Sequence, residues 1–485
     1  MTEVELNRLY RSCALTNTMI AAEVDGMRSG AAFRCSRGLY PWDGRWSEDM
    51  YCRLWLIDGQ LCGGEFRSRP ELLEFALAAA RRIVAREDYL HIHVRGNEYV
   101  VRVGRYEEYS WSQQRSKELL GKLVEMGVIE GVPPTVPVVV ERSMDLGAIG
   151  ERATEGMLIG GAVGDALGYP VESMTYEERS KHYGYIRKFI ANRRTRGAVG
   201  VVSDDTQMSF DTLIVLLANG FVDMEDLASI FSSHKMFGIG GTVKEFLRRY
   251  KDGGATWYRS SIESGGNGAV MRIHPLLIAH ASGINDGVRG LYADLVLDTV
   301  MTHRGALAVS LSVAFASLLA RLASGGRVDP HEELSVFGEI VRAVGGRVRA
   351  EVHRKVPFDE GNDVADYVAN AVTWGLESGV SVEEFASLNA VGSSGYLLET
   401  VPTALFIIFR HIDEPLRAVL EAANKTYDND TVASLVGTAM GARHGVRPFA
   451  ELADGLCGCI REDDVGTIGR LTTMATEFVR DRARG

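Results

Sequence analysis

From about Gly147 onward the chain repeats one pattern, in which apolar runs at helical spacing alternate with glycine-rich turns. Such runs surround residues 211–217, 227–231, 306–322, 365–374 and 431–442. Apolar residues that recur every three or four positions are typical of helices with one buried face. Strand signals are nearly absent after the stretch GAVGVVS, so we expect residues 151–485 to form an all-α domain.

The first part of the chain has a different pattern. Apolar and polar residues alternate around the turn signals Asp58-Gly59 and Gly96-Asn97, which predicts two β-hairpins. Helical spacing follows Pro70 and returns at about 112–126. Because 485 residues exceed a usual single domain, we expect a small α+β domain of unknown role at residues 1–132 and a proline-containing linker at 133–150. The expected fold class is mainly α.

Charge and composition narrow the class of protein. A formal net charge of -11 argues against binding to a nucleic-acid backbone. The segment MTEVELNRLYRSC lacks the apolar core of a secretory signal, so we expect a cytoplasmic protein. The least polar stretch, 305–320, is shorter than the roughly 20 residues of a membrane helix and is expected to be a buried core helix. The six cysteines include no CxxC pair and are expected to be free thiols.

Two short acidic elements, VVSDDTQM and YDNDTVAS, stand directly before apolar-periodic helices. Both supply hydroxyl and carboxylate side chains: Ser203, Asp204, Asp205, Asp428, Asp430 and Thr431. Either element could simply cap its helix, because such side chains accept hydrogen bonds from unpaired backbone N–H groups. Together they offer the oxygen ligands that Mg²⁺ prefers, and they could hold two metals about 3.5–4 Å apart. Like charges packed this closely would repel one another without a cation.

Three glycine-rich stretches accompany these elements. In GMLIGGAVGDALGYPVE, Asp165 could brace a neighbouring ligand and Glu172 could reach a metal or a water; the alternative is a closely packed helix with Glu172 in solvent. ESGGNGAVMRIHPL suits the approach of phosphates, with Arg272 adding charge nearby, although it could be an ordinary turn. KMFGIGGTVKEF is a second such loop, and neither loop matches a Walker A or complete GxGxxG pattern.

Five motifs, taken in order, resemble the ADP-ribosylglycohydrolase family: GAVGDALGYPVE, SDDTQMSF, SGGNGAVMR, MTHRGALA and YDNDTVASLVGTAMGARHG. The resemblance covers about 155–445. It implies an all-α fold with two Mg²⁺ ions, or Mn²⁺ in some members, in a cleft that binds ADP-ribose. It also implies an enzyme that hydrolyses the bond between ribose C1″ and an acceptor such as an arginine side chain, which reverses ADP-ribosylation.

The resemblance further implies roles for individual residues. The six residues of the two acidic elements would be metal ligands, Glu172 would contact metal or the attacking water, and Asp165 would lie behind the site. The substrate-binding residues would be Gly238, Gly240, Gly241, Thr242, Gly265, Gly266, Asn267, Gly268 and His303. Thr426 and Tyr427 replace two glycines that are common in the family. We therefore expect Tyr427 to lie beside the ribose and to influence the choice of acceptor.

Two other functions stay open at this stage. The N-terminal region could dock on an ADP-ribosyltransferase toxin or its target, which would make the chain an immunity or binding protein, with or without hydrolase activity. The acidic helices could also belong to a Mg²⁺-dependent diphosphate enzyme of the terpene-synthase kind. The stretch DDTQM lacks the final acid of the DDxxD pattern that those enzymes need, which argues against this function.

Overall fold

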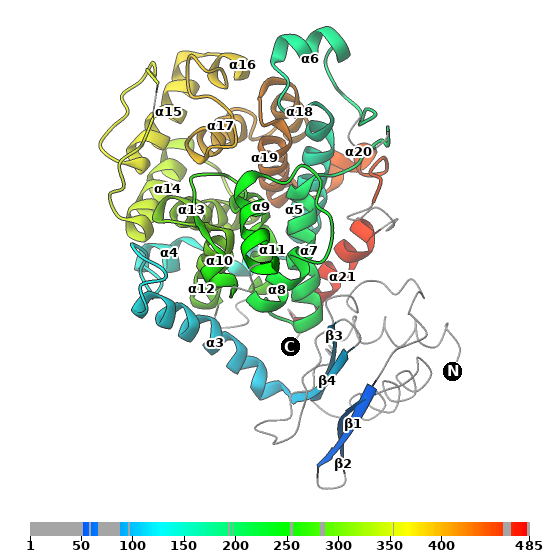
Figure 1. Ribbon diagram of the computed structural model, residues 1–485. Coiled ribbons are helices and arrows are strands. Elements are labelled where there is room, and N and C mark those ends of the chain that lie inside the picture. Colours follow the sequence, from blue (N-terminus) through cyan, green and yellow to red (C-terminus); the bar gives the residue numbers. More distant parts are fainter. Residues whose placement is uncertain are drawn as a thin grey trace.

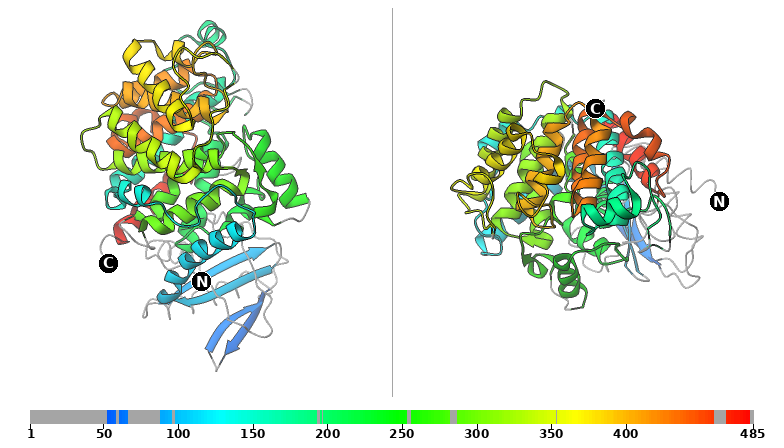
Figure 2. Two further views of the ribbon diagram at one scale, coloured as in Figure 1. Left: turned by 90° about the vertical axis from the view of Figure 1, so that its left-hand side faces the viewer. Right: turned by 90° about the horizontal axis from the view of Figure 1, so that it is seen from above.

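The computed structural model describes the backbone of strands 52–57, 60–65, 88–95 and 98–105 and of residues 106–482, with gaps at 193–194, 196, 253–255, 282–286, 353 and 459–466. Side chains are described from residue 116 onward. Within these residues nearly all regular structure is helical, and the helices gather in one body (Figures 1 and 2). The predicted mainly α fold is confirmed.

The strands form the two predicted hairpins. Strand β1 (Cys52–Ile57) pairs antiparallel with β2 (Gln60–Glu65), and β3 (Asp88–Arg95) pairs antiparallel with β4 (Glu98–Arg105). The helix expected after Pro70 lies outside the described residues. The helix expected at 112–126 is α3, which begins earlier, directly after β4.

The helices follow one another along the rest of the chain. Their bounds are α3 Tyr106–Glu125, α4 Val138–Ser143, α5 Glu151–Gly168, α6 Tyr176–Tyr183, α7 Asp204–Asn219, α8 Met224–Phe231, α9 Gly241–Leu247, α10 Trp257–Ser260, α11 His274–Ala279, α12 Gly287–Thr302, α13 Ala306–Ala323, α14 Pro330–Gly345, α15 Val364–Ser378, α16 Val382–Phe385, α17 Leu397–Arg410, α18 Pro415–Lys425, α19 Asn429–His444, α20 Ala450–Ala453 and α21 Thr467–Arg482. Each of the five predicted apolar runs falls within one of these helices.

The core is apolar and continuous, and α13 runs through it. Among the described helices only α13 is long and apolar enough to cross a membrane, yet 83% of it is buried inside the protein. This burial confirms the prediction of a core helix at 305–320. A helix surrounded by other helices on all sides is expected to be apolar all round.

The segment 133–150, predicted as a linker, is packed against the helical body. It contains α4 and the short 3₁₀ helix Leu146–Ala148, and it buries Val140 and Ile149 in the common core. Leu120 and Leu123 of α3 are buried in the same core, and Pro133 accepts a 2.8 Å hydrogen bond from the Tyr292 hydroxyl of α12. Helix α3 is therefore part of the helical body.

Helices α5 and α19 lie side by side with their backbones in contact (Figures 1 and 2). The contact is made by small residues four positions apart on both helices: Gly156, Gly160, Gly164 and Gly168 on α5, and Ala433, Gly437 and Gly441 on α19. A Cβ at any of these α5 glycines would overlap the backbone of α19. The glycine-rich stretch is thus a closely packed helix, and it brings the C-terminal turns of α5 against the first turn of α19.

Candidate active site

The first acidic element caps α7. The Ser203 side chain accepts a 3.2 Å hydrogen bond from the Asp205 N–H, while the Asp204 N–H donates to the Phe237 carbonyl over 2.6 Å. The second element differs, because the Asp428 side chain makes no capping bond to α19. Its carboxylate instead accepts a 2.6 Å hydrogen bond from the Asn267 amide. Capping therefore explains only part of the acidic residues.

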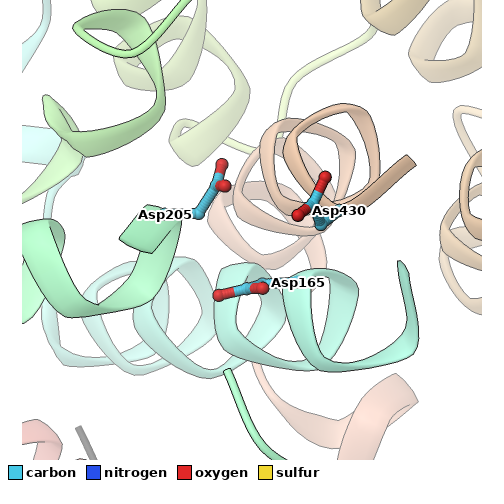
Figure 3. Close-up of side chains that lie close together, drawn as sticks. All are labelled: Asp165, Asp205 and Asp430. Carbon is cyan, nitrogen blue, oxygen red and sulfur yellow. The ribbon is translucent and has the colours of Figure 1, made fainter. Parts of the chain in front are cut away.

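Carboxylates from three helices converge at this point. Asp165 of α5, Asp205 of α7 and Asp430 of α19 each place one oxygen within 4.8 Å of the other two (Figure 3). Glu172, Asp428 and Asp430 form a second group of the same kind. Because both groups include Asp430, they are neighbours, and two adjacent groups of oxygen ligands are what a two-metal centre requires.

Asp165 braces the start of α7. Its carboxylate is fully buried and accepts 2.9 Å bonds from the Ser203 N–H. It also accepts bonds of 3.1 Å from the Thr206 N–H and 2.5 Å from the Thr206 hydroxyl. With both oxygens already accepting hydrogen bonds, Asp165 holds the acidic turn of α7 from behind.

Asp205 has one oxygen in use and one without a partner. Its Oδ2 accepts hydrogen bonds from the hydroxyls of Ser203, over 3.1 Å, and Thr431, over 3.2 Å. Its Oδ1 is buried and has no hydrogen-bond partner among the described residues. A buried carboxylate oxygen without a partner is unfavourable unless a cation or a donor satisfies it. The site therefore fits a metal ion on this side.

The pKa values of the clustered carboxylates also favour a bound cation. Burial raises the pKa of Asp165 and of Asp428 to about 6. Burial, and then the neighbouring carboxylates, raise the pKa of Asp204, Asp205 and Asp430 well above the usual range. A divalent cation would stabilise the ionised forms, and a donor set made only of oxygens suits hard cations such as Mg²⁺ or Mn²⁺.

A cavity of about 310 Å³ opens onto these carboxylates. It is lined by residues of the acidic elements and glycine loops: Glu172, Ser173, Asp204, Asp205, Gly238, Gly240, Gly241, Thr242, Val243, Gly266, Asn267, Gly268, Met271, His303, Gly395, Tyr427, Asp428, Asp430 and Thr431. Of the sequence-predicted residues, Asp165, Ser203 and Gly265 are not among the lining residues. Gly265 packs under the ring of Tyr396.

The two glycine loops are held together on one wall of the cavity. Thr242 and Ser264 share a 2.9 Å hydrogen bond between their hydroxyls. Strand β5 (Ile262–Glu263) pairs in parallel with β6 (His303–Arg304), which brings the second loop against His303. Gly238 has φ +82°, and a Cβ there would lie 3.0 Å from Asp204 Oδ1, so this position requires glycine. Backbone N–H groups at such turns can bind anionic oxygens.

Arg272 does not face the cavity, contrary to what its place in the sequence suggested. Its side chain is fully buried and donates from Nε to both Asp298 carboxylate oxygens over 3.3 Å. It also donates to the Gly268 carbonyl over 2.9 Å. Its charge is therefore neutralised within the core, and among the described residues that line the cavity none is Lys or Arg.

Two segments of the site were missed in the sequence. The loop 393–396 lies beside the second glycine loop, because the Asn267 N–H donates to Gly395 over 3.0 Å and the Leu397 N–H donates to Gly265 over 2.8 Å. Its sequence, VGSSGYLLET, has the same small residues before a helix and could have been found by that signal. Ser173 has no such signal, yet it adopts a left-handed φ of +67° beside Glu172.

The loop of Glu172 is tied to the segment that carries Tyr427 and Asp428. The Ser173 N–H donates to the Tyr427 carbonyl over 3.1 Å. Buried Arg179 of α6 donates to the carbonyls of Met174, over 2.9 Å, and Thr426, over 2.5 Å. These bonds place Glu172 opposite the second acidic element, while the Tyr427 side chain, 46% exposed, stands at the cavity.

In this all-α body, carboxylates from three helices converge beside a cavity and could bind metal ions, an arrangement that suits an enzyme. The family model for ADP-ribosylglycohydrolases matches residues 148–477. The chain therefore belongs to the ADP-ribosylglycohydrolase family, as the motifs indicated, and is an ADP-ribosyl glycohydrolase, a hydrolase that acts on glycosyl bonds.

The chain is also similar to individual proteins. The chain is 27% identical over 294 residues to the ADP-ribosyl-[dinitrogen reductase] glycohydrolase of Rhodospirillum rubrum, covering 60% of this chain and 85% of the relative. It is 23% identical over 302 residues to the ADP-ribosylarginine hydrolase Tri1 of Serratia proteamaculans, covering 60% and 71%. A solved ADP-ribosylglycohydrolase-related protein complex matches 68% of this chain and 98% of its own with 22% identity and a TM-score of 0.47.

Proposed function

We propose that the chain is a divalent-metal-dependent ADP-ribosylhydrolase that removes ADP-ribose from arginine side chains. The observation that carries the metal dependence is the pair of carboxylate groups that share Asp430, together with the unpaired Oδ1 of Asp205. The residues that would hold two Mg²⁺, or Mn²⁺, are Asp204, Asp205, Asp428, Asp430 and Thr431, with Ser203 behind them. When bound, the metal ions would neutralise the carboxylates and lower the pKa of a bound water.

The side chains of the protein supply the remaining steps. Breaking the bond at ribose C1″ passes through an oxocarbenium-like state, so the ribose must be held and a water must lose a proton. A carboxylate oxygen of Glu172 would accept that proton, and the position of Glu172 at the cavity, grouped with Asp428 and Asp430, supports this role. Asn267 orients the Asp428 carboxylate through their 2.6 Å bond, and the glycine loops would bind the diphosphate.

The metal centre is tested by calorimetry on EDTA-stripped protein. Wild type should bind Mg²⁺ or Mn²⁺ and then ADP-ribose, whereas Asp430→Asn should lose both and keep its fold. Asp454→Asn serves as the control, because Asp454 is exposed at the end of α20. Near-normal hydrolysis by Asp430→Asn would remove the proposed centre.

The choice of acceptor rests on Tyr427. A half-exposed aromatic ring at the cavity favours a cationic acceptor, because a guanidinium is attracted by the face of a tyrosine ring. One relative is named an ADP-ribosylarginine hydrolase. We expect Tyr427→Gly to reduce kcat/KM about tenfold on arginine-linked ADP-ribose and to leave serine-linked ADP-ribose unaffected, with Tyr427→Phe close to wild type. Equal losses on both substrates would argue against this role.

The immunity function stays a prediction. It depends on residues 1–132, of which the structure describes side chains only from residue 116 onward. Because α3 packs in the helical core, a deletion that tests docking on an ADP-ribosyltransferase should end before Tyr106. Unchanged binding and substrate choice after that deletion would contradict docking through this region.

A further inference from the structure

The His303 ring lies between the glycine loop of the cavity wall and the buried end of α12. The residue is 2% exposed and lines the cavity. A Cβ on Gly266 would lie 3.3 Å from His303 Nε2, and one on Gly268 would lie 3.0 Å from Cε1, so the Nε2 edge faces the glycine loop. The opposite nitrogen, Nδ1, lies 2.8 Å from the Thr302 hydroxyl oxygen.

The Thr302 hydroxyl has only one direction in which to donate. Its oxygen already accepts a 3.0 Å hydrogen bond from Arg272 Nη2, and a guanidinium cannot accept in return. Among the described residues, His303 Nδ1 is the one acceptor within reach of the hydroxyl hydrogen. Thr302 therefore donates to Nδ1, which leaves the ring hydrogen on Nε2.

The position of Arg272 is fixed by other hydrogen bonds, so the bond from the Thr302 hydroxyl to His303 Nδ1 keeps its direction. It donates to the Asp298 carboxylate, to the Asp298 carbonyl over 2.7 Å and to the Gly268 carbonyl over 2.9 Å. If His303 carried its hydrogen on Nδ1 instead, the buried Thr302 hydrogen would have no acceptor. The cost of an unsatisfied buried donor corresponds to a tautomer ratio of roughly 10- to 100-fold in favour of the hydrogen on Nε2.

The charge state of the ring is set by the same surroundings. Burial, and then the charge of Arg272, lower the pKa of His303 to about 3. The ring is therefore neutral near pH 7 and has one N–H to offer. In a neutral imidazole the position of that hydrogen decides whether the cavity meets a donor or an acceptor.

We infer that Thr302 is a positioning residue that holds His303 as the neutral tautomer with its hydrogen on Nε2, so that Nε2–H donates to an anionic oxygen of the ligand in the cavity. This inference rests on the proposed function only for the identity of the ligand, a nucleoside diphosphate sugar. Donation from a neutral ring compensates in part for the lack of Lys and Arg among the described lining residues. The direction of the hydrogen bonds stands independently of the ligand.

The test combines a spectroscopic signature with binding. Long-range ¹H–¹⁵N spectra distinguish the two neutral tautomers, and the His303 signal is assigned among the 11 histidines by its loss in His303→Gln. Wild type should show the Nε2–H pattern. Thr302→Val should shift the ring toward the other tautomer and weaken ADP-ribose binding about tenfold or more, and Thr302→Ser should restore both.

Thr299→Val is the matched control. Thr299 is on the same helix and fully buried, but its hydroxyl has no hydrogen-bond partner among the described residues. This variant should leave the ring signature and ADP-ribose binding unchanged. An Nδ1–H pattern in wild type, or an unaltered pattern in Thr302→Val, would overturn the inference. Because the spectra need no ADP-ribose, failure of the proposed function would show separately, as absent binding with the Nε2–H pattern intact.

Discussion

Replacing Gly164 with alanine should destabilise the protein although alanine is the better helix former. The added Cβ would lie within 3.0 Å of three backbone atoms of Ala433 and Ser434, so α5 and α19 would have to separate. Overpacking of this kind costs about 3 kcal/mol at the upper end of its usual range, because backbone cannot rotate away. The higher helix propensity of alanine stabilises the folded state by about 1 kcal/mol. The free energy of unfolding should therefore fall by about 2 kcal/mol.

The same substitution, glycine to alanine, should have the opposite effect on stability at another position in the chain. Gly121 lies within α3, and a Cβ there meets nothing within 4 Å. Gly121→Ala should stabilise the protein by up to about 1 kcal/mol. The two variants should thus differ by about 3 kcal/mol in the free energy of unfolding, measured by urea denaturation in EDTA.

The contact between α5 and α19 should also affect metal binding, because α5 carries Asp165 and α19 carries Asp430. Gly164→Ala should weaken Mn²⁺ binding about tenfold or more, because the carboxylate oxygens lie farther apart once the two helices separate. Calorimetry would measure this change. Gly121→Ala should bind Mn²⁺ as wild type does. If Gly164→Ala were as stable as wild type, the backbone contact that we describe between the helices would be refuted.

Three further outcomes are expected. In EDTA, stability should fall as pH rises from about 4 to about 6, because burial raises the pKa of Asp165 from 3.8 to about 6. The carboxyl favours the folded state only while it is protonated, so the loss is about 3 kcal/mol in all, which thermal melts from about pH 3 to about pH 7 with and without Mg²⁺ would measure. Gly238→Ala should lower metal-dependent hydrolysis, because of its φ of +82° and its closeness to Asp204, whereas Gly469→Ala on α21 should not, since a Cβ there meets nothing within 4 Å and Gly469 does not line the cavity. Arg179→Lys should lower the free energy of unfolding by about 1–3 kcal/mol in urea titrations, because one ammonium cannot satisfy the carbonyls of Met174, Asn424 and Thr426 together.

Local patterns predicted the helices well, and they failed where packing is non-local. The apolar runs of α8 and α15 identify those helices because burial of one face leaves a 3.6-residue period in the sequence. The prolines of the segment 133–150 suggested a linker, whereas Pro137 is the N-cap of α4. Pro133 contacts Tyr292, 159 residues away, and no local pattern records such a contact.

In the site, too, local features were predicted from the sequence and non-local contacts were not. Hydroxyls and carboxylates before two helices were visible in the sequence, and the structure brings Asp205 and Asp430 together with Asp165. The sequence also places the Arg272 charge beside a glycine loop, but the partner that neutralises it, Asp298, lies 26 residues later on another helix. Ser173 could not be found at all, because its left-handed backbone is imposed by its surroundings rather than by its side chain.

The helices that carry the carboxylates of the centre are synthesised far apart in time, α5 early and α19 late. Arg152 of α5 bonds to Arg443 of α19, 291 residues later in the chain. At typical rates of synthesis this separation corresponds to roughly 15–60 s. During that interval the apolar and acidic faces of α5 and α7 have no α19 to pack against. Completion of the carboxylate centre is therefore a late event in biogenesis, and binding of the proposed metal ions would follow the emergence of α19.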